Sequence, residues 1–409
     1  MSLPIFLQQP LPFLPSSCQI HPPSLQAWLW TASVHGGITL FVGVPLALVA
    51  YYHRHRPWRL RIVALLLAMG IPWSLHAYQD KHGMDQVPWM CRFLINTFTF
   101  GVVLKLWNVS ADQVPPQAYQ SLHTFCQWFL VVPEPKLLLV DADEKDRRLD
   151  LAEIQAQWHS VCYKIVTATL LLSLLLPWHE QYYQINPLTF LEPDKATIPL
   201  TNNVAAAAAA AVVQVVLNGF VHIWWMYIFL AFCLDVSSLL HAIVHGPVEK
   251  GFCNPLLASR SLRQAWGTRW NLPVQKHLHR TVYQPLRQEW GCSRVTAALG
   301  TFVGSGLLHE YNFWSHNYGA YRSPGAVTAF FVAMGILMLA EAYVWDHWCP
   351  QPVQKVIEWL PSPVIAVGLT LLVSIPVEHY FVPTWLEAGM IESVSQLFPH
   401  ITCDWGEGG

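Results

Sequence analysis

The stretch WLWTASVHGGITLFVGVPLALVAYY, residues 28–52, contains no Asp, Glu, Lys or Arg. A helix over these residues would extend about 37 Å, which exceeds the ~30 Å hydrocarbon core of a bilayer. Low charge is general, since 12% of the 409 residues are charged and 53% are hydrophobic. Soluble domains carry about 25% charged residues. The composition excludes an ordinary soluble domain and a disordered chain, and it indicates a polytopic membrane protein.

Seven further stretches are long and apolar enough to cross a bilayer. Four contain no Asp, Glu, Lys or Arg: 62–78, 204–234, 325–340 and 362–377. Three tolerate ionisable residues: 93–109 with Lys105, 161–178 with Lys164, and 295–314 with His309 and Glu310. We predict an all-α transmembrane bundle of eight spans. The uncharged run 197–234 could hold one long helix or two, which leaves nine or ten spans open.

Basic residues set the orientation of such a bundle, because cytosolic loops carry an excess of Lys and Arg. Segment 53–61 contains four arginines, and segment 246–294 contains eight Lys and Arg against two Glu. With eight spans, both segments lie in the cytosol. The chain then divides into a proline-rich extramembrane tail, two sets of transmembrane helices separated by a cytosolic or interfacial segment, and a second tail: 1–27, 28–245, 246–294, 295–382 and 383–409.

Several classes of protein are excluded or made less probable by the same counts. The first Lys or Arg is Arg54, so the chain has no basic n-region of a signal peptide. The net charge of −2 provides no basic field for nucleic acid. The nine cysteines are scattered without a C-x-x-C pair, which supports neither a zinc site nor a disulfide framework. The lack of an internal repeat argues against a transporter built from inverted repeats.

Residues 261–287 predict an amphipathic helix in the membrane interface, which we expect Pro273 and Pro285 to kink or end. Trp266 and Trp270 lie on its apolar side, as does Asn271, whose carboxamide needs a hydrogen-bond partner there. One stripe of this helix holds four basic residues: Arg269, Lys276, Arg280 and Arg287. The stripe either anchors the helix on anionic lipid headgroups or docks an anionic ligand such as coenzyme A through its phosphates.

Residues 299–314 predict a membrane helix with one polar stripe in an apolar body. The stripe falls within an arc of about 80° and consists of Thr301, Ser305, His309, Asn312 and His316. An ionisable residue at membrane depth is a functional candidate, and histidine is the commonest general base. The alternative is that His309, one of 19 histidines, makes a hydrogen bond between helices.

Other readings of these motifs have less support. Phe313 stands where an H-E-x-x-H zinc site needs its second histidine, and Gly304-Ser305-Gly306 lacks the spacing of a nucleophile elbow. His241 and His245 share one helix face, which leaves a metal site open. The sequence alone assigns no role to Glu310 or Glu341.

Together, the two segments resemble the membrane-bound O-acyltransferase superfamily, and most closely its wax synthase branch. The matching motifs, in order, are Trp266-Gly267, Arg269-Trp270-Asn271, Val282-Tyr283-Gln284-Pro285, Ser305-Gly306-Leu307-Leu308-His309-Glu310, and Phe330-Phe331 with Gly335 and Glu341. Three motifs in this order on a polytopic chain are a specific signal. The resemblance covers about residues 255–345.

The resemblance implies transfer of an acyl group from acyl-coenzyme A to an alcohol, without a metal or a bound cofactor. His309 is then the catalytic base, and Asn271 orients the substrate or donates to the developing oxyanion. The expected acyl-coenzyme A contacts are Trp266, Arg269, Trp270, Lys276, Arg280, Tyr283 and Arg287. The residues expected to line the reaction chamber are Thr301, Ser305 and Asn312.

The chain departs from the plant pattern at Ala265 and Thr268, where an aromatic residue and a second arginine are usual. Its proline-rich, tryptophan-rich build is similar to fungal members of the branch. We therefore expect an acetyltransferase that uses acetyl-coenzyme A and a hydrophobic terpenoid or meroterpenoid alcohol, in the bilayer of the endoplasmic reticulum. The alternatives are a long-chain wax-ester synthase and, from another class, a membrane transporter.

Overall fold

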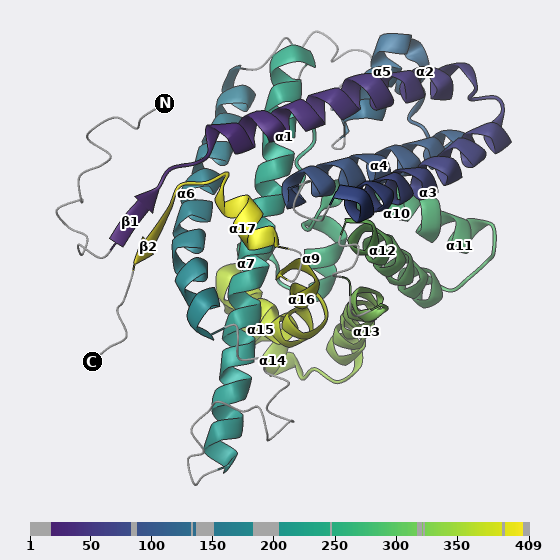
Figure 1. Cartoon of the computed structure of the whole chain (residues 1–409). Coiled ribbons are helices and arrows are strands. Elements are labelled where there is room, and N and C mark those ends of the chain that lie inside the picture. Colours follow the sequence, from purple (N-terminus) through teal and green to yellow (C-terminus); the bar gives the residue numbers. More distant parts are fainter. Residues whose placement is uncertain are drawn as a thin grey trace.

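The computed structural model describes residues 18–82, 88–131, 134–135, 151–182, 204–245, 248–316, 321, 324–386 and 389–403. All eight predicted spans are helical in it (Figure 1). They are α1 (Leu25–Ile38) continuing through a π turn, η2 (Thr39–Gly43), into α2 (Val44–Tyr52), then α3 (Pro57–His82), α4 (Trp89–Ser110), α6 (Leu151–Tyr182), α7 (Val204–His245), α12 (Arg294–His316), α13 (Ala326–His347) and α15 (Ser362–Tyr380). The run that was open to one helix or two holds the single helix α7.

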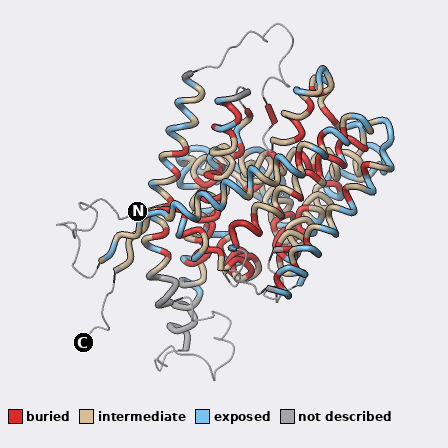
Figure 2. The backbone as a smooth tube through the Cα atoms, turned by 45° about the horizontal axis from the view of Figure 1, so that its top comes forward, coloured by how far each residue is buried: buried red, intermediate tan, exposed pale blue. Residues whose placement is uncertain are grey.

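Among the described residues, seven helical stretches are long and apolar enough to cross a membrane. The eighth predicted span, α12, is not one of them, because it carries the polar stripe with His309 and Glu310. Large apolar side chains on the outer helices are exposed, among them Phe41 at 76% and Trp73 at 76%. Figure 2 shows this exposure along the outer tubes. Apolar surface of this extent indicates contact with lipid, so the protein is an integral multi-pass membrane protein.

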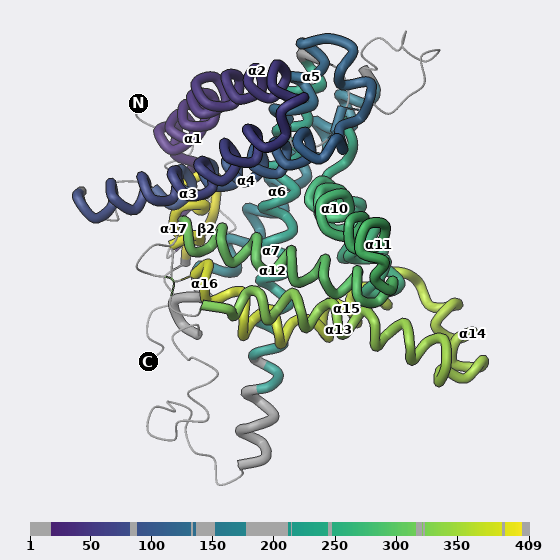
Figure 3. The backbone as a smooth tube through the Cα atoms, turned by 90° about the vertical axis from the view of Figure 1, so that its right-hand side faces the viewer, coloured from purple at the N-terminus to yellow at the C-terminus, as the bar shows by residue number. Residues whose placement is uncertain are grey.

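The centre of the bundle is packed with aromatic side chains from α4 and α7, including Trp89, Phe93 and Phe229. Figure 3 shows α7 crossing α12, α13 and α15. Helices α7 and α15 approach closely at Gly219, where an added Cβ would lie 2.2 Å from the backbone oxygen of Ser374. Only glycine fits this crossing, in the way that small residues allow membrane helices to approach.

The two lysines tolerated within spans have partners, as buried cations require. Lys164 of α6 forms an ion pair with Asp235 of α7. Lys105 of α4 donates to the Trp128 carbonyl at 2.8 Å and lies 4.2 Å from the centroid of the Trp128 ring. Trp128 belongs to α5 (Leu122–Leu130), which follows the 3-10 turn η4 (Pro116–Gln120).

The two ends of the described chain meet in a small sheet. Strand β1 (Cys18–His21) pairs antiparallel with β2 (His400–Cys403), with Cys18 opposite Cys403, after the short helices α16 (Val382–Leu386) and α17 (Met390–Ser395). Cys18 is disulfide-bonded. The expectation from cysteine spacing, which supports no disulfide framework, therefore fails at Cys18.

The segment between α7 and α12 is not one amphipathic helix. It consists of α8 (Pro255–Ala258), α9 (Leu262–Thr268), α10 (Leu272–Leu278), a π turn η8 (His279–Tyr283) and α11 (Gln284–Gln288). The helix breaks at Asn271, which adopts a left-handed conformation with φ of 40°. Asparagine is one of the few residues other than glycine that adopts this conformation readily. A short amphipathic helix, α14 (Gln351–Trp359), projects from the body between α13 and α15 (Figure 3).

Candidate active site

His309 lies on α12, half-buried, and its ring is held by the backbone of its own helix. Nδ1 lies 2.7 Å from the carbonyl oxygen of Ser305. A carbonyl only accepts, so Nδ1 carries the proton of the neutral ring and Nε2 is the basic nitrogen. The ring also packs against Phe331, at a centroid distance of 4.3 Å. This arrangement orients a neutral imidazole with one nitrogen available to accept a proton.

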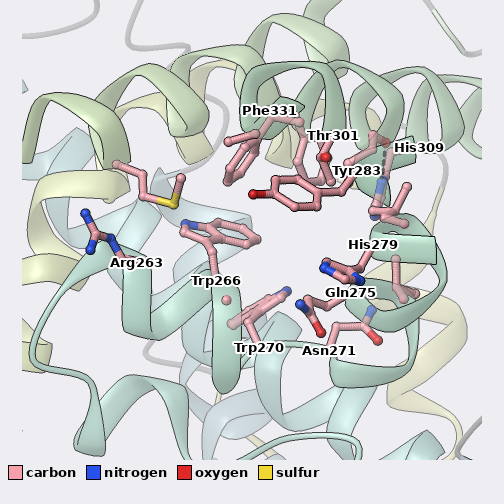
Figure 4. Close-up of a pocket in the computed structure, with 17 residues that line it drawn as sticks. Arg263, Trp266, Trp270, Asn271, Gln275, His279, Tyr283, Thr301, His309 and Phe331 are labelled. Atoms are coloured by element: carbon pink, nitrogen blue, oxygen red, sulfur yellow. Dashed lines mark hydrogen bonds between the residues drawn. The ribbon is translucent and has the colours of Figure 1, made fainter. Parts of the chain in front are cut away.

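A first cavity of about 280 Å³ opens beside His309, between the α9–α10–η8 segment and helices α12 and α13. Figure 4 shows the side chains that line it. Seven predicted residues are among them: Trp266, Trp270, Asn271, Tyr283, Thr301, Ser305 and His309. These residues come from α9, from the break between α9 and α10, from η8 and from α12. Their convergence could be predicted only in part, because it depends on how α9 and α10 fold back over α12.

A second cavity of about 150 Å³ lies deeper in the bundle, against α4 and α7. It contains Asn312, the remaining predicted chamber residue, together with Lys105 and His277. The two cavities share six lining residues: Trp266, Trp270, Asn271, Val274, His309 and Phe331. His309 and Asn271 therefore lie at the boundary between two compartments, which is where two substrates could meet.

Asn271 is fixed by the backbone around it. Its carbonyl accepts from the Gln275 amide at 3.0 Å, at the start of α10. The neighbouring Leu272 amide donates to Gly251 at 2.8 Å, and Cys253 donates to Arg269 at 2.9 Å. These bonds tie the break between α9 and α10 to the incoming chain. The carboxamide of Asn271 is thus held at the wall of both cavities.

The four residues of the predicted basic stripe do not line either cavity. Arg280 binds both carboxylate oxygens of Glu134, and Lys276 pairs with Glu249. The other two cations donate to backbone carbonyls, Arg269 to Cys253 at 2.9 Å and Arg287 to Cys292. The helical wheel placed these residues on one free face, but Glu134 is 146 positions away from Arg280 in the sequence and could not be anticipated as its partner.

Glu134 is ionised at the centre of this cluster. Its side chain is 3% exposed. Burial raises the pKa of the carboxyl, but the hydrogen bond from Arg280 and the charges of Lys105 and Lys276 outweigh burial and lower the pKa to about 2. Arg280 of η8 and Lys276 of α10 are therefore held by an ion network whose central carboxylate, Glu134, is buried.

Sequence reasoning missed three polar residues of the first cavity: Arg263, Gln275 and His279. Arg263 is exposed, and it is the only Asp, Glu, Lys or Arg among the described lining residues. The sequence feature that could have indicated Arg263 is its spacing of three from Trp266, which places both residues on one face of α9. His279 stacks on Tyr283 at a centroid distance of 5.0 Å, and burial together with Arg280 lowers its pKa.

The two motif glutamates join elements of the site. Glu341 of α13 accepts from the Leu262 amide at 2.8 Å and thereby fixes the first turn of α9. Glu310 accepts from Tyr321, from the Gly325 amide, and from the Thr328 amide at 2.9 Å, so it caps α13. The hydrogen bond from Tyr321 to this carboxylate and burial both raise the pKa of Tyr321.

The metal site that the sequence left open has no support among the described residues, where no group of three His, Cys, Asp or Glu could hold an ion. His241 is 7% exposed on α7. The side chains of His245 and His316 lie outside the described part of the structure.

Comparison with known proteins supports the motif assignment. Residues 248–333 match the model of the membrane bound O-acyl transferase family. In Arabidopsis thaliana, the probable long-chain-alcohol O-fatty-acyltransferase 7 is 34% identical over 155 residues, which is 34% of this chain and 43% of that protein. The probable long-chain-alcohol O-fatty-acyltransferase 6 is 33% identical over 176 residues, 41% and 48% of the two chains.

A relative whose name gives a different acceptor is acyl-CoA–sterol O-acyltransferase 1 of Arabidopsis thaliana, 36% identical over 110 residues, 26% of this chain and 31% of that protein. The chain spans less than half the length of each of these curated relatives. The resemblance to the membrane-bound O-acyltransferases and their wax synthase branch is confirmed over this part of the chain. The narrower likeness to fungal acetyltransferases stays a prediction.

Proposed function

On the premise that residues 248–333 match the membrane bound O-acyl transferase family, we propose that this protein is an acyl-coenzyme A-dependent O-acyltransferase acting on a hydrophobic alcohol. The observation that carries the proposal is the position of His309, with a fixed tautomer, at the boundary of two cavities. A two-substrate transfer without a covalent intermediate needs this arrangement, with one base between two bound reactants.

The proposed reaction is direct. Nε2 of His309 takes the proton of the acceptor hydroxyl. At the same time the hydroxyl oxygen forms a bond to the carbonyl carbon of the thioester. The carbonyl oxygen becomes an oxyanion, to which the Asn271 carboxamide donates. The carbon–sulfur bond then breaks, and the departing thiolate takes the proton from the His309 imidazolium. The products are an ester and free coenzyme A.

The donor is assigned to the first cavity, where Arg263 provides a cation for the phosphates of coenzyme A. The acceptor is assigned to the second cavity, which extends into the apolar interior among Phe93, Phe313 and Trp385. Trp266, Trp270 and Phe331 form a wall common to both cavities and exclude water from the thioester. Exclusion of water favours transfer to the alcohol over hydrolysis.

Two alternative pairs of acyl donor and acceptor alcohol are consistent with this function. The names of the relatives favour a fatty acyl donor with a long-chain alcohol or a sterol. The resemblance to fungal members favours acetyl-coenzyme A with a terpenoid or meroterpenoid alcohol, in the endoplasmic reticulum. Microsomes given acetyl- or palmitoyl-coenzyme A with hexadecanol, a sterol or a terpenoid alcohol would separate the two, with products identified by mass spectrometry.

The catalytic assignment is tested in the same preparation. The variant His309→Ala should lose ester formation, whereas His379→Ala, which removes an exposed histidine of α15, should keep it. Equal amounts of inserted protein must be verified for each variant. Activity in His309→Ala would show that the mechanism is wrong. Substrate flux into sealed vesicles without any ester product would instead favour the transporter.

A further inference from the structure

The second cavity contains a polar pair that the proposed reaction does not use. His277 of α10 lines this cavity and is 4% exposed, and Asn108 of α4 behind it is fully buried. Nδ2 of Asn108 lies 2.8 Å from Nδ1 of His277. An amide nitrogen donates, so Nδ1 of the ring accepts and the remaining ring nitrogen, Nε2, carries the proton. The pair presents a histidine of fixed tautomer to the cavity.

The charges around His277 keep the ring neutral. Burial is the main reason why its pKa falls to about 3, and the cations Lys105, Arg280 and Lys276 lower it further, against the opposite effect of Glu134. Because Nδ1 of the neutral ring already accepts from Asn108, the Nε2–H donor is the ring's remaining hydrogen-bonding group. Nε2 has no protein partner among the described residues.

The other polar side chains that line the second cavity, apart from the tryptophan indoles, are Lys105, Asn271, His309, Thr97 and Asn312. Lys105 donates to the Trp128 carbonyl, and Asn271 and His309 belong to the proposed reaction centre. A plain long-chain alcohol has one oxygen, and that oxygen reacts at His309. An occupant of this kind would leave the Nε2–H of His277 without an acceptor, which is unfavourable for a buried donor.

We propose that His277 determines acceptor specificity, by donating from Nε2 to a second oxygen of the acceptor alcohol that is separate from the reacting hydroxyl. The preferred acceptor is then a hydrophobic alcohol with a further ketone, ether, ester or hydroxyl oxygen. This inference rests on the proposed function and deepens it, since it names the class of acceptor. His277 does not line the first cavity, so its contact is with the acceptor and not with the donor.

The test uses the full-length protein in microsomes and two acceptor scaffolds. One is hexadecan-1-ol with a single ketone placed at successive carbons, and the other is a saturated sterol-like 3-alcohol with or without a ketone on the ring farthest from the hydroxyl. At least one keto-alcohol should exceed its parent alcohol in kcat/KM by roughly 10- to 100-fold. In His277→Phe, which removes the donor, this ratio should fall to about one.

Two further variants make the test specific. His277→Gln keeps a donor of similar reach and should retain part of the preference, which guards against a folding defect in His277→Phe. His279→Phe changes a histidine of the first cavity and should leave the ratio of the two acceptors unchanged.

The outcomes separate this inference from the function on which it rests. Absence of ester with every donor and acceptor overturns the proposed function. Transfer without any preference for a keto-alcohol, or a preference that survives in His277→Phe, overturns the role of His277 alone. A higher KM for acyl-coenzyme A with unchanged acceptor preference would place His277 against the donor and would also overturn it.

Discussion

The segment that connects α7 to α12 has two faces that differ in the kind of polarity they present. The face toward the cavities offers mostly neutral groups: Trp266, Trp270, Asn271, Gln275, His279 and Tyr283. The opposite face holds four cations, each bound to a carboxylate or a carbonyl of the protein. Charges in a region of low dielectric must be paired, so the charged face supports the fold. Neutral donors and acceptors remain available for substrates.

The largest effect should come from breaking the buried ion network on the charged face. Glu134→Ala leaves Arg280 and Lys105 without their counter-charge, which should lower the free energy of unfolding by about 3–5 kcal/mol. Thermal unfolding of the detergent-solubilised protein would measure the change. The control is Glu289→Ala, at an exposed glutamate of the segment between α7 and α12. This variant should change the free energy of unfolding by less than about 0.5 kcal/mol. Equal stabilities of the two variants would contradict the pairing.

The pH dependence of the free energy of unfolding provides a second test of the pairing of Glu134. The pKa of Glu134 is lowered from 4.5 in the unfolded chain to about 2 in the fold. A carboxyl with a lowered pKa stabilises the fold above the unfolded value, and the stabilisation is lost as the pH falls from 4.5 toward 2. Glu134→Gln should therefore show a shallower decline in stability than the wild type over this range. Parallel curves would mean that Glu134 is not the responsible group.

On the face toward the cavities, Asn271 should have the largest effect on catalysis. Asn271→Gly keeps a residue that adopts the left-handed conformation and removes only the carboxamide. Loss of one oxyanion donor should lower kcat by about 10²-fold with little change in stability. Steady-state kinetics and melting temperature would be measured together. A variant with wild-type kcat would exclude the carboxamide from the reaction.

Substitution of Arg263 and substitution of a paired cation should differ in their effect on KM for the acyl donor. Arg263→Ala should raise KM for acyl-coenzyme A by about 10-fold, the effect of one charge-assisted contact. The same variant should leave KM unchanged for an acyl-N-acetylcysteamine thioester, which lacks the phosphates. Arg287→Ala should not discriminate between the two donors, since its guanidinium is bound to the Cys292 carbonyl. An equal rise with both donors would argue against a phosphate contact.

The sequence predicted the helices well and the contacts between them poorly. Long apolar runs locate membrane helices because a bilayer requires length and apolarity, so all eight predicted stretches are helical, and seven of them are long and apolar enough to cross a membrane among the described residues. The polar stripe on α12 likewise indicated His309. The break at Asn271 could not be predicted from periodicity, because it depends on a left-handed residue whose neighbours, Leu272 and Arg269, are bonded to Gly251 and Cys253.

The partners of the charged residues in this segment could not be predicted. Helical spacing indicated which cations share a stripe but not what lies opposite, and Glu134 comes from a distant part of the chain. Arg263 was missed because its spacing of three from Trp266 places both residues on one face of α9 but does not show that this face borders a cavity. The motif glutamates Glu310 and Glu341 also acquired a role only when their partners were known: both accept from backbone amides at helix starts.

The central claim is that Nε2 of His309 acts as a general base on the acceptor hydroxyl. The most direct measurement compares wild type and His309→Ala with hexadecan-1-ol and with 2,2-difluorohexadecan-1-ol, an acceptor of similar shape whose hydroxyl is more acidic. General-base catalysis contributes about 10²–10⁴-fold, and a more acidic hydroxyl depends less on it. The wild-type to variant rate ratio should therefore be smaller for the fluorinated alcohol. Equal ratios for the two alcohols, or a variant as active as the wild type, would contradict the claim.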